Sequence, residues 1–238
     1  MKLVLTKTLW GCNEVGDQSK WEGLLARVKS QGFDAIELAV AGLPKDGSLD
    51  APWKEATENA GLKLVAQLHT CWYVERPAAA ALSGGVYSQG IVGSESPREH
   101  LSSFEAQSKR AIAMGACRIN SHSGHDSWDL ETATSFLRDA MKISERLGLG
   151  TITTHETHRR RVLWNPFQAA SILRELPDLR ITADLSHWCC VLERIPDSTS
   201  DSMWEPLLAQ LSKCVDLIHA RVGAAETPQV AHPASPDV

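Results

Sequence analysis

The chain has 238 residues, 43% of them hydrophobic, and a formal net charge of -5 at pH 7. This length is enough to bury a large core, and (β/α) barrels of about 250 residues commonly form one domain. The acidic balance argues against a general nucleic-acid surface, and no stretch approaches the roughly 20 apolar residues that span a membrane. We therefore expect a single domain over residues 1–238.

Short apolar runs alternate with amphipathic stretches, which is typical of βα units around a parallel sheet. Strands are predicted at 2–9, 34–40, 62–69, 117–122, 150–155, 180–185 and 215–220. Helices are predicted between them at 18–31, 51–60, 97–115, 129–147, 166–176 and 201–213. Several helices are followed by glycine, the residue that accepts the positive φ at a helix end.

Two segments break this alternation. Residues 70–96 contain four glycines and have neither helical nor strand period. Connections this long are usually lids or disordered segments, so we expect a mobile lid after the third strand, with a short helix as the alternative. Residues 224–238 contain three prolines and offer no eighth strand. We expect an open barrel of seven strands, whose unpaired edges a second copy of the chain could cover as a homodimer.

Most of the histidines lie near the ends of predicted strands. Seven of the nine lie within a few residues of the C-terminal end of a predicted strand, and in a parallel barrel these ends meet on the face that carries the active site. Trp10 and Trp188 also follow strands and predict an aromatic rim, although packing beneath loops explains them equally well. The seven histidines are His69, His122, His125, His155, His158, His187 and His219.

The stretch 181–188, ITADLSHW, shows the arrangement most clearly. A buried strand ends in Asp184, and His187 follows three residues later. A carboxylate and an imidazole placed in this way can present a metal ion and a substrate oxygen together, while a helix cap or turn is the structural alternative. Glu156 follows the preceding strand, beside the basic run of residues 159–161, which could meet an anionic substrate.

Four motifs together resemble the xylose isomerase-like TIM barrels, a family that includes sugar epimerases, hydroxypyruvate isomerase and endonuclease IV. They are most similar to the branch of sugar phosphate isomerases and epimerases, and the resemblance covers nearly the whole chain. It implies an α/β fold, a (β/α)8 TIM barrel that here lacks strand 8. The motifs are NSHSGHDSW (120–128), HETHRRRVLWNP (155–166), DLSHW (184–188) and IHARVG (218–223).

The resemblance also implies a site. It places a divalent metal on Glu156, Asp184 and His219, and it gives His187 and Arg221 contacts with substrate oxygens. Glu156, His187 and Arg221 are then the expected catalytic residues. The fourth metal ligand of the family, a glutamate on strand 8, has no counterpart in this sequence. Further substrate contacts are expected from His69, His122, His158, Trp10 and Trp188.

Two carboxylates and one imidazole suit Mn²⁺, Mg²⁺ or Co²⁺ and also admit Zn²⁺. A metal chelated by a carbonyl and a neighbouring hydroxyl acidifies the proton between them, and a carboxylate can then move that proton through an enediolate. The expected activity is isomerisation or epimerisation of a sugar or sugar phosphate. The six cysteines have no CxxC spacing and the N-terminus is not a signal peptide, so we expect reduced thiols and a cytoplasmic protein.

Two other functions fit the same residues. A degenerate barrel would keep the fold and bind a ligand without turnover, and the absent strand 8 favours it. A zinc phosphodiesterase of the endonuclease IV type would cleave abasic DNA. His69 and His122 stand where its additional ligands would lie, whereas the acidic composition argues against it.

Overall fold

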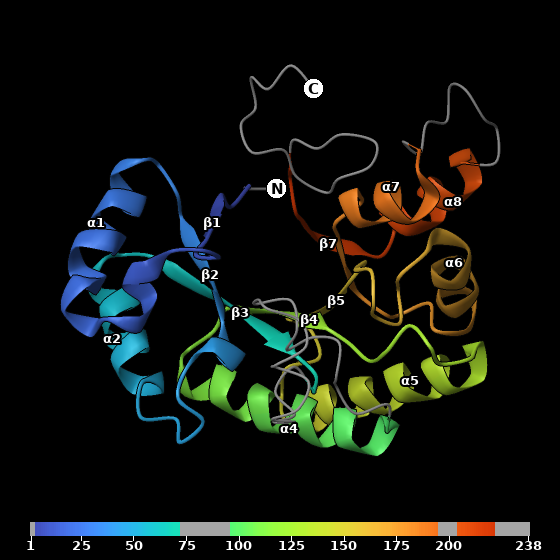
Figure 1. The fold of residues 1–238 in the computed structure, drawn as a ribbon, viewed down its shortest axis with the longest axis horizontal. Coiled ribbons are helices and arrows are strands. Elements are labelled where there is room, and N and C mark those ends of the chain that lie inside the picture. The colour runs from blue at the N-terminus through green and yellow to red at the C-terminus, as the bar shows by residue number, and fades with distance from the viewer. Residues whose placement is uncertain (1–2, 72–95, 195–203, 222–238) are drawn as a thin grey trace, which may run out of the picture. The chain divides into compact units, whose positions relative to one another are not determined.

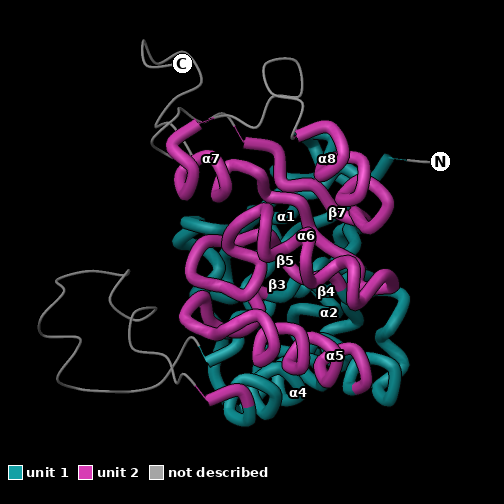
Figure 2. The backbone as a smooth tube through the Cα atoms, turned by 90° about the vertical axis from the view of Figure 1, so that its right-hand side faces the viewer, with its two compact units in different colours: residues 1–94, 98–121, 143–153 teal, residues 95–97, 122–142, 154–238 magenta. Residues whose placement is uncertain are grey.

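The computed structural model describes residues 3–71, 96–194 and 204–221. Most of the expected lid at 70–96 and all of the tail at 224–238 lie outside these ranges. Both expectations therefore stay predictions. The chain divides into two compact units, and the expectation of a single domain also stays a prediction. Unit 1 comprises residues 1–94, 98–121 and 143–153, and unit 2 comprises residues 95–97, 122–142 and 154–238 (Figure 2).

Seven strands follow one another in the sheet in the order β1 to β7 (Figure 1). The pairings of β1 with β2, β2 with β3, β5 with β6 and β6 with β7 are parallel, as the alternating pattern predicted. Each predicted strand is confirmed, usually over a shorter range. The strands are β1 Thr6–Thr8, β2 Ala35–Ala39, β3 Lys63–His69, β4 Arg118–His122, β5 Thr153–Glu156, β6 Ile181–Ala183 and β7 Val215–Ile218.

The six predicted helices are present, and a further helix follows β6. The helices are α1 Trp21–Ser30, α2 Asp50–Asn59, α4 Pro97–Ala113, α5 Leu130–Arg146, α6 Pro166–Glu175, α7 Ser186–Leu192 and α8 Trp204–Ser212. Short 3-10 turns cover Asn13–Gly16, Gln18–Lys20 and Val40–Gly42. The sequence did not predict α7, because seven residues without a side-chain cap give too little periodicity to detect.

In unit 1, α1 and α2 lie on the same side of strands β1 to β3 (Figure 1). Helix α1 buries four side chains with helical spacing, as an amphipathic helix against a core does. The indole rings of Trp21 and Trp53 join α1 to α2, with centroids 3.9 Å apart. The buried face of α1 consists of Trp21, Leu24, Leu25 and Val28.

In unit 2, strand register decides which residues leave the sheet together. Glu156 pairs with Thr182 in the β5–β6 ladder. The β6–β7 ladder is irregular between Ile181 and Thr182, and beyond the irregularity Ala183 pairs with Ile218. The residues that follow β6 and β7 are therefore brought level with the end of β5.

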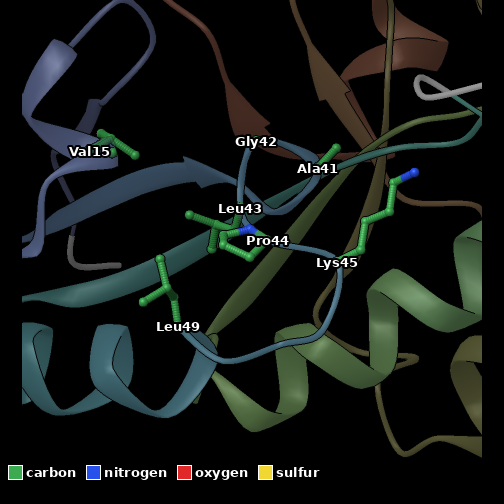
Figure 3. Close-up of a pocket in the computed structure, with 8 residues that line it drawn as sticks. Val15, Ala41, Gly42, Leu43, Pro44, Lys45 and Leu49 are labelled. Atoms are coloured by element: carbon green, nitrogen blue, oxygen red, sulfur yellow. The ribbon is translucent and has the colours of Figure 1, made fainter. Parts of the chain in front are cut away.

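A cavity of about 460 Å³ lies in unit 1, where the chain leaves β2 (Figure 3). Its lining is mainly apolar and contains none of the site residues expected from the sequence. It is formed by Val15, Gly16, Ala41, Gly42, Leu43, Pro44, Lys45 and Leu49. Among the residues that the structure describes, no helix is both long and apolar enough to cross a membrane.

An ion pair inside unit 1 joins α4 to α2. The Arg110 guanidinium donates from Nε to Asp50 Oδ2 at 2.9 Å and from Nη2 to Asp50 Oδ1 at 2.6 Å. The two side chains are only 17% and 7% exposed. Such a bidentate pair is strong, and removing one partner leaves a charge that water reaches poorly.

Replacing Asp50 by asparagine is therefore expected to lower the free energy of unfolding by about 3 kcal/mol, measured by urea denaturation. Asp139→Asn is the matched control. It removes an exposed pair in which Lys142 Nζ lies 2.8 Å from Asp139 Oδ1, with side chains 67% and 45% exposed. Its cost should stay below about 1 kcal/mol. Equal losses in the two variants would contradict the prediction.

Candidate metal centre

The candidate centre forms where β5, β6 and β7 end in unit 2. Glu156 is the last residue of β5, Asp184 follows β6 directly, and His219 follows β7. Two hydrogen bonds hold these ends together: His219 N donates to the backbone oxygen of Ala183 at 3.0 Å, and Asp184 N donates to the Thr157 side-chain Oγ1 at 2.8 Å. The strand ends themselves thus position the three side chains.

The three side chains are spaced as ligands of one ion. His219 Nδ1 lies 3.4 Å from Asp184 Oδ2 and 3.6 Å from Glu156 Oε2. One ligand atom from each residue lies within 4.8 Å of the others. Four ligands placed tetrahedrally about 2.1 Å from a metal are about 3.4 Å apart. The donor set therefore fits a divalent cation in both chemistry and spacing.

The electrostatics keep Asp184 ionised although it is buried. Burial raises the pKa of this carboxyl, but a hydrogen bond from His219 and electrostatic interactions with His187 and Arg221 outweigh it and lower the pKa to about 2. Arg221 Nε lies 2.8 Å from Asp184 Oδ2, and Ser186 Oγ donates to Asp184 Oδ1. Asp184 is therefore a carboxylate at neutral pH, the form that binds metals.

His187 is carried by the first turn of α7, and its Nε2 lies 3.8 Å from Asp184 Oδ2 and 4.0 Å from Glu156 Oε1. Within the described part of the chain, neither of its ring nitrogens has a hydrogen-bond partner. Burial lowers the pKa of this imidazole to about 4, although both carboxylates act in the opposite direction. A neutral, buried imidazole in this position can bind a ligand oxygen.

His122 and His158 adjoin the same centre. His122 Nε2 lies 2.7 Å from Glu156 Oε2. The His158 ring lies between two others, with centroids 4.4 Å from His122 and 3.8 Å from His187. Burial lowers the pKa of His158 well below its usual value, as do the neighbouring histidines. The structure thus brings His122 and His158, two of the five further residues expected to contact substrate, next to Glu156.

Three further residues were expected to contact substrate, namely Trp188, Trp10 and His69. The Trp188 side chain is fully buried, and its indole nitrogen donates to Leu163 O at 3.0 Å, which matches packing beneath a loop. Trp10 and His69 belong to unit 1, with ring centroids 6.4 Å apart. His69 Nε2 lies 3.0 Å from Gln67 Oε1. Their roles as substrate contacts stay predictions.

Two residues that position Asp184 were not expected from the sequence. Thr157 accepts a hydrogen bond from the Asp184 backbone, and Ser186 donates one to its carboxylate. A serine two residues after an aspartate is a weak turn signal, whereas nothing in the sequence pairs Thr157 with Asp184, because they follow two different strands, β5 and β6.

No protein-family model and no curated protein matches this sequence. Solved structures do match. A sugar phosphate isomerase/epimerase from Parabacteroides distasonis gives a TM-score of 0.62 at 13% identity, covering 94% of this chain and 80% of that one. D-allulose 3-epimerase from Methylomonas sp. gives 0.61 at 12% identity, covering 94% and 73%. The probable 3-DHS dehydratase AsbF from Bacillus anthracis gives 0.57 at 12% identity, covering 94% and 75%.

The chain has the xylose isomerase-like TIM barrel fold. Its described strands form an incomplete (β/α)8 barrel of this type, as the motifs implied. Of the three matching structures named above, one is a probable dehydratase, one is a sugar phosphate isomerase/epimerase and one is an epimerase. The fold therefore serves more than one reaction, and the activity has to be argued from the residues of the site.

Proposed function

We propose that this protein is a divalent-metal-dependent isomerase or epimerase of sugars or sugar phosphates. The observation that carries the proposal is the convergence of Glu156, Asp184 and His219 at the ends of three successive strands, with ligand atoms within 4.8 Å of one another. The likeness to a sugar phosphate isomerase/epimerase and a sugar epimerase supports the substrate class. The donor set of two carboxylates and one imidazole suits Mn²⁺, Mg²⁺ or Co²⁺, and also Zn²⁺.

A bound divalent cation would polarise a substrate carbonyl and its neighbouring hydroxyl. The protein's own residues would then move the proton. The Glu156 carboxylate accepts the proton from the carbon between the two oxygens, which generates an enediolate. His187, neutral and buried, donates a hydrogen bond to a substrate oxygen. Arg221 keeps Asp184 ionised through its 2.8 Å contact and offers its remaining donors to the substrate.

The proposal is tested by metal analysis of the purified protein, followed by a screen of keto sugars and their phosphates for carbon–deuterium exchange in heavy water. Exchange detects enolisation even when net conversion is slow. We expect exchange with at least one substrate in the presence of Mn²⁺, its loss with EDTA, and its return when Mn²⁺ is restored. Asp184→Asn should bind Mn²⁺ at least about tenfold more weakly, since even residues outside the ligand shell change affinity by this factor.

Exchange that persists in EDTA would contradict the metal requirement. A metal-loaded protein that catalyses no exchange with any substrate in the screen would contradict the activity and favour a non-catalytic barrel that binds a ligand.

A further inference from the structure

The Arg159 side chain is half-buried, yet no carboxylate within the described part of the chain forms an ion pair with it. Many other arginines of the protein do have such a partner. A guanidinium that is partly removed from water is costly unless an anion faces it, so this position points to an anionic ligand. The arginines paired with carboxylates include Arg27, Arg110, Arg138, Arg146, Arg180 and Arg221.

Arg159 belongs to a turn that directly follows β5 and is held on both sides. Arg161 N donates to His158 O at 3.2 Å and closes the turn. Between them Arg160 has φ +65°, which a residue other than glycine adopts rarely and mostly where the surroundings enforce it. His158 Nδ1 lies 2.5 Å from Arg159 O, and Arg161 Nη1 donates to Gly124 O at 3.2 Å. The backbone that carries Arg159 is therefore fixed.

The Arg159 guanidinium contacts helix α7 beside the candidate metal centre. Burial raises the pKa of the Cys190 thiol, while the charge of Arg159 and a hydrogen bond from it act in the opposite direction. Burial also lowers the pKa of His187, and the charges of Arg221 and Arg159 act in the same direction. A thiol is a weak acceptor and a guanidinium has five N–H donors. Cys190 therefore does not meet the hydrogen-bonding capacity of Arg159.

The charges around the centre match a doubly charged anion. As metal ligands, Glu156 and Asp184 are deprotonated and carry one negative charge each. Arg159 and Arg221 carry one positive charge each, so the four side chains cancel. The divalent cation of the proposed function would leave a net charge of about +2 on this group at pH 7. A phosphate monoester carries about −1.5 to −2 at this pH, whereas a free sugar carries no charge.

We propose that Arg159 recognises the phosphate group of the substrate, so that the protein acts on sugar phosphates in preference to free sugars. Guanidinium groups bind phosphate through two parallel hydrogen bonds, and the phosphate oxygens would replace Cys190 as the partner of Arg159. This role rests on the proposed function, which supplies both the sugar and the metal ion. In the competing arrangement, Arg159 only joins the turn to α7 through Cys190 and takes no part in binding.

Binding of an alditol with and without a phosphate group isolates this contact. An alditol has no carbonyl group and cannot be enolised, so isothermal titration calorimetry measures binding alone. D-glucitol 6-phosphate with D-glucitol is one matched pair, and ribitol 5-phosphate with ribitol is a second. At least one phosphate should bind to the Mn²⁺-loaded wild-type protein about 10- to 100-fold more tightly than its parent alditol, the effect of a hydrogen bond between charged groups.

Arg159→Gln should lose most of this preference. Its affinity for the phosphorylated alditol should fall by about tenfold or more, the same effect in reverse, while its affinity for the parent alditol stays at the wild-type value. Arg159→Lys keeps the positive charge but loses the planar pair of donors, so it should show a smaller preference than wild type. Circular dichroism checks that each variant is folded, and a Mn²⁺ titration checks that its metal affinity is unchanged.

Two control variants separate the contact from the charge and from the packing. Arg160→Asn removes one positive charge from the same turn. The Arg160 side chain is exposed, and asparagine tolerates the positive φ at this position. Cys190→Ala removes the thiol that contacts Arg159 but leaves the guanidinium. Both variants should keep the wild-type preference for the phosphorylated alditol.

A preference in wild type that is lost in Arg159→Gln and kept in both controls would support the proposed role. Equal binding of the two members of each pair by wild type, or binding of neither, would overturn it. A preference that survives in Arg159→Gln would overturn it too, because the phosphate would then contact the metal ion or another residue. Equal losses in Arg159→Gln and Arg160→Asn would reveal only the general positive charge of the turn and reject a specific contact.

Exchange in heavy water separates this role from the proposed function. Free keto sugars that exchange as fast as their phosphates would overturn the role of Arg159 and leave the isomerase or epimerase activity intact. A phosphate preference that depends on Arg159, without exchange of any keto sugar or keto sugar phosphate, would contradict the activity and leave Arg159 as a phosphate-binding residue.

Discussion

Replacing Glu156 by glutamine lowers the rate of carbon–deuterium exchange by at least about 100-fold, the usual contribution of a positioned general base. The amide has nearly the shape of the carboxylate but cannot accept the proton. Because glutamine is also a weaker metal ligand, the rate is measured over a Mn²⁺ titration and compared at saturation. The exchange rate of Glu156→Gln should stay low at saturating Mn²⁺, whereas a variant that lost only metal affinity would regain the wild-type rate.

Glu175→Gln is the control for this variant. Glu175 is exposed at the end of α6, where its carboxylate lies 3.7 Å from Arg138 Nη2. The Glu175→Gln protein should catalyse carbon–deuterium exchange at the wild-type rate. Full exchange by Glu156→Gln at saturating Mn²⁺ would show that another group moves the proton, and it would remove Glu156 from the catalytic role while leaving it a ligand.

Replacing Gly124 by alanine lowers the free energy of unfolding by several kcal/mol, the largest stability loss we expect. Gly124 has φ +66°, where an L side chain is strained, and an added Cβ would lie 2.6 Å from Trp128 Cζ3 and even closer to Val162 Cγ1. Overpacking of this kind costs about 1–3 kcal/mol, and the backbone strain adds to it.

Gly148→Ala isolates the backbone contribution. Gly148 has a similar φ of +73°, but an added Cβ would meet nothing within 4 Å. Its cost should stay near 1 kcal/mol, the cost of a left-handed conformation for alanine. Urea denaturation of both variants measures the difference. Similar losses would show that the loop moves to make room for the Gly124 methyl group.

The loss at Gly124 should also affect the site. The Gly124 carbonyl accepts a hydrogen bond from Arg161 Nη1 at 3.2 Å, and Ser123 Oγ lies 2.6 Å from His155 Nδ1. The loop after β4 is thus tied to the residues on both sides of Glu156. We therefore expect Gly124→Ala to bind Mn²⁺ more weakly than Gly148→Ala does.

Much of the fold could be predicted from the sequence because its signals are local. A buried strand and an amphipathic helix each show their own period within a few residues, so the seven strands and six helices were recognisable without knowledge of the packing. The positions at which strands end are equally local. Glu156, Asp184 and His219 could therefore be proposed as one group from the strand ends and the family resemblance.

The sequence could not decide which polar residues converge. His155 and Glu156 are adjacent, yet successive side chains on a strand point to opposite faces. His155 contacts Ser123, whereas Glu156 lies with Asp184 and His219. Trp188 and His187 are also adjacent, and one packs beneath a loop while the other faces Asp184. These outcomes depend on the register of β5 to β7 and on the turn of α7.

The sequence by itself determined the βα order and the supply of carboxylates and imidazoles at strand ends, because both are properties of short stretches. Only the tertiary structure decided that Glu156 lies beside two histidines, His122 and His158, as well as beside Asp184 and His219. Its neighbours His122, His158, Asp184 and His219 come from four different strand ends. Distances of 2.7 to 3.6 Å between groups so far apart in sequence arise from strand pairing and from the irregularity between β6 and β7. No pattern within a single strand encodes that pairing.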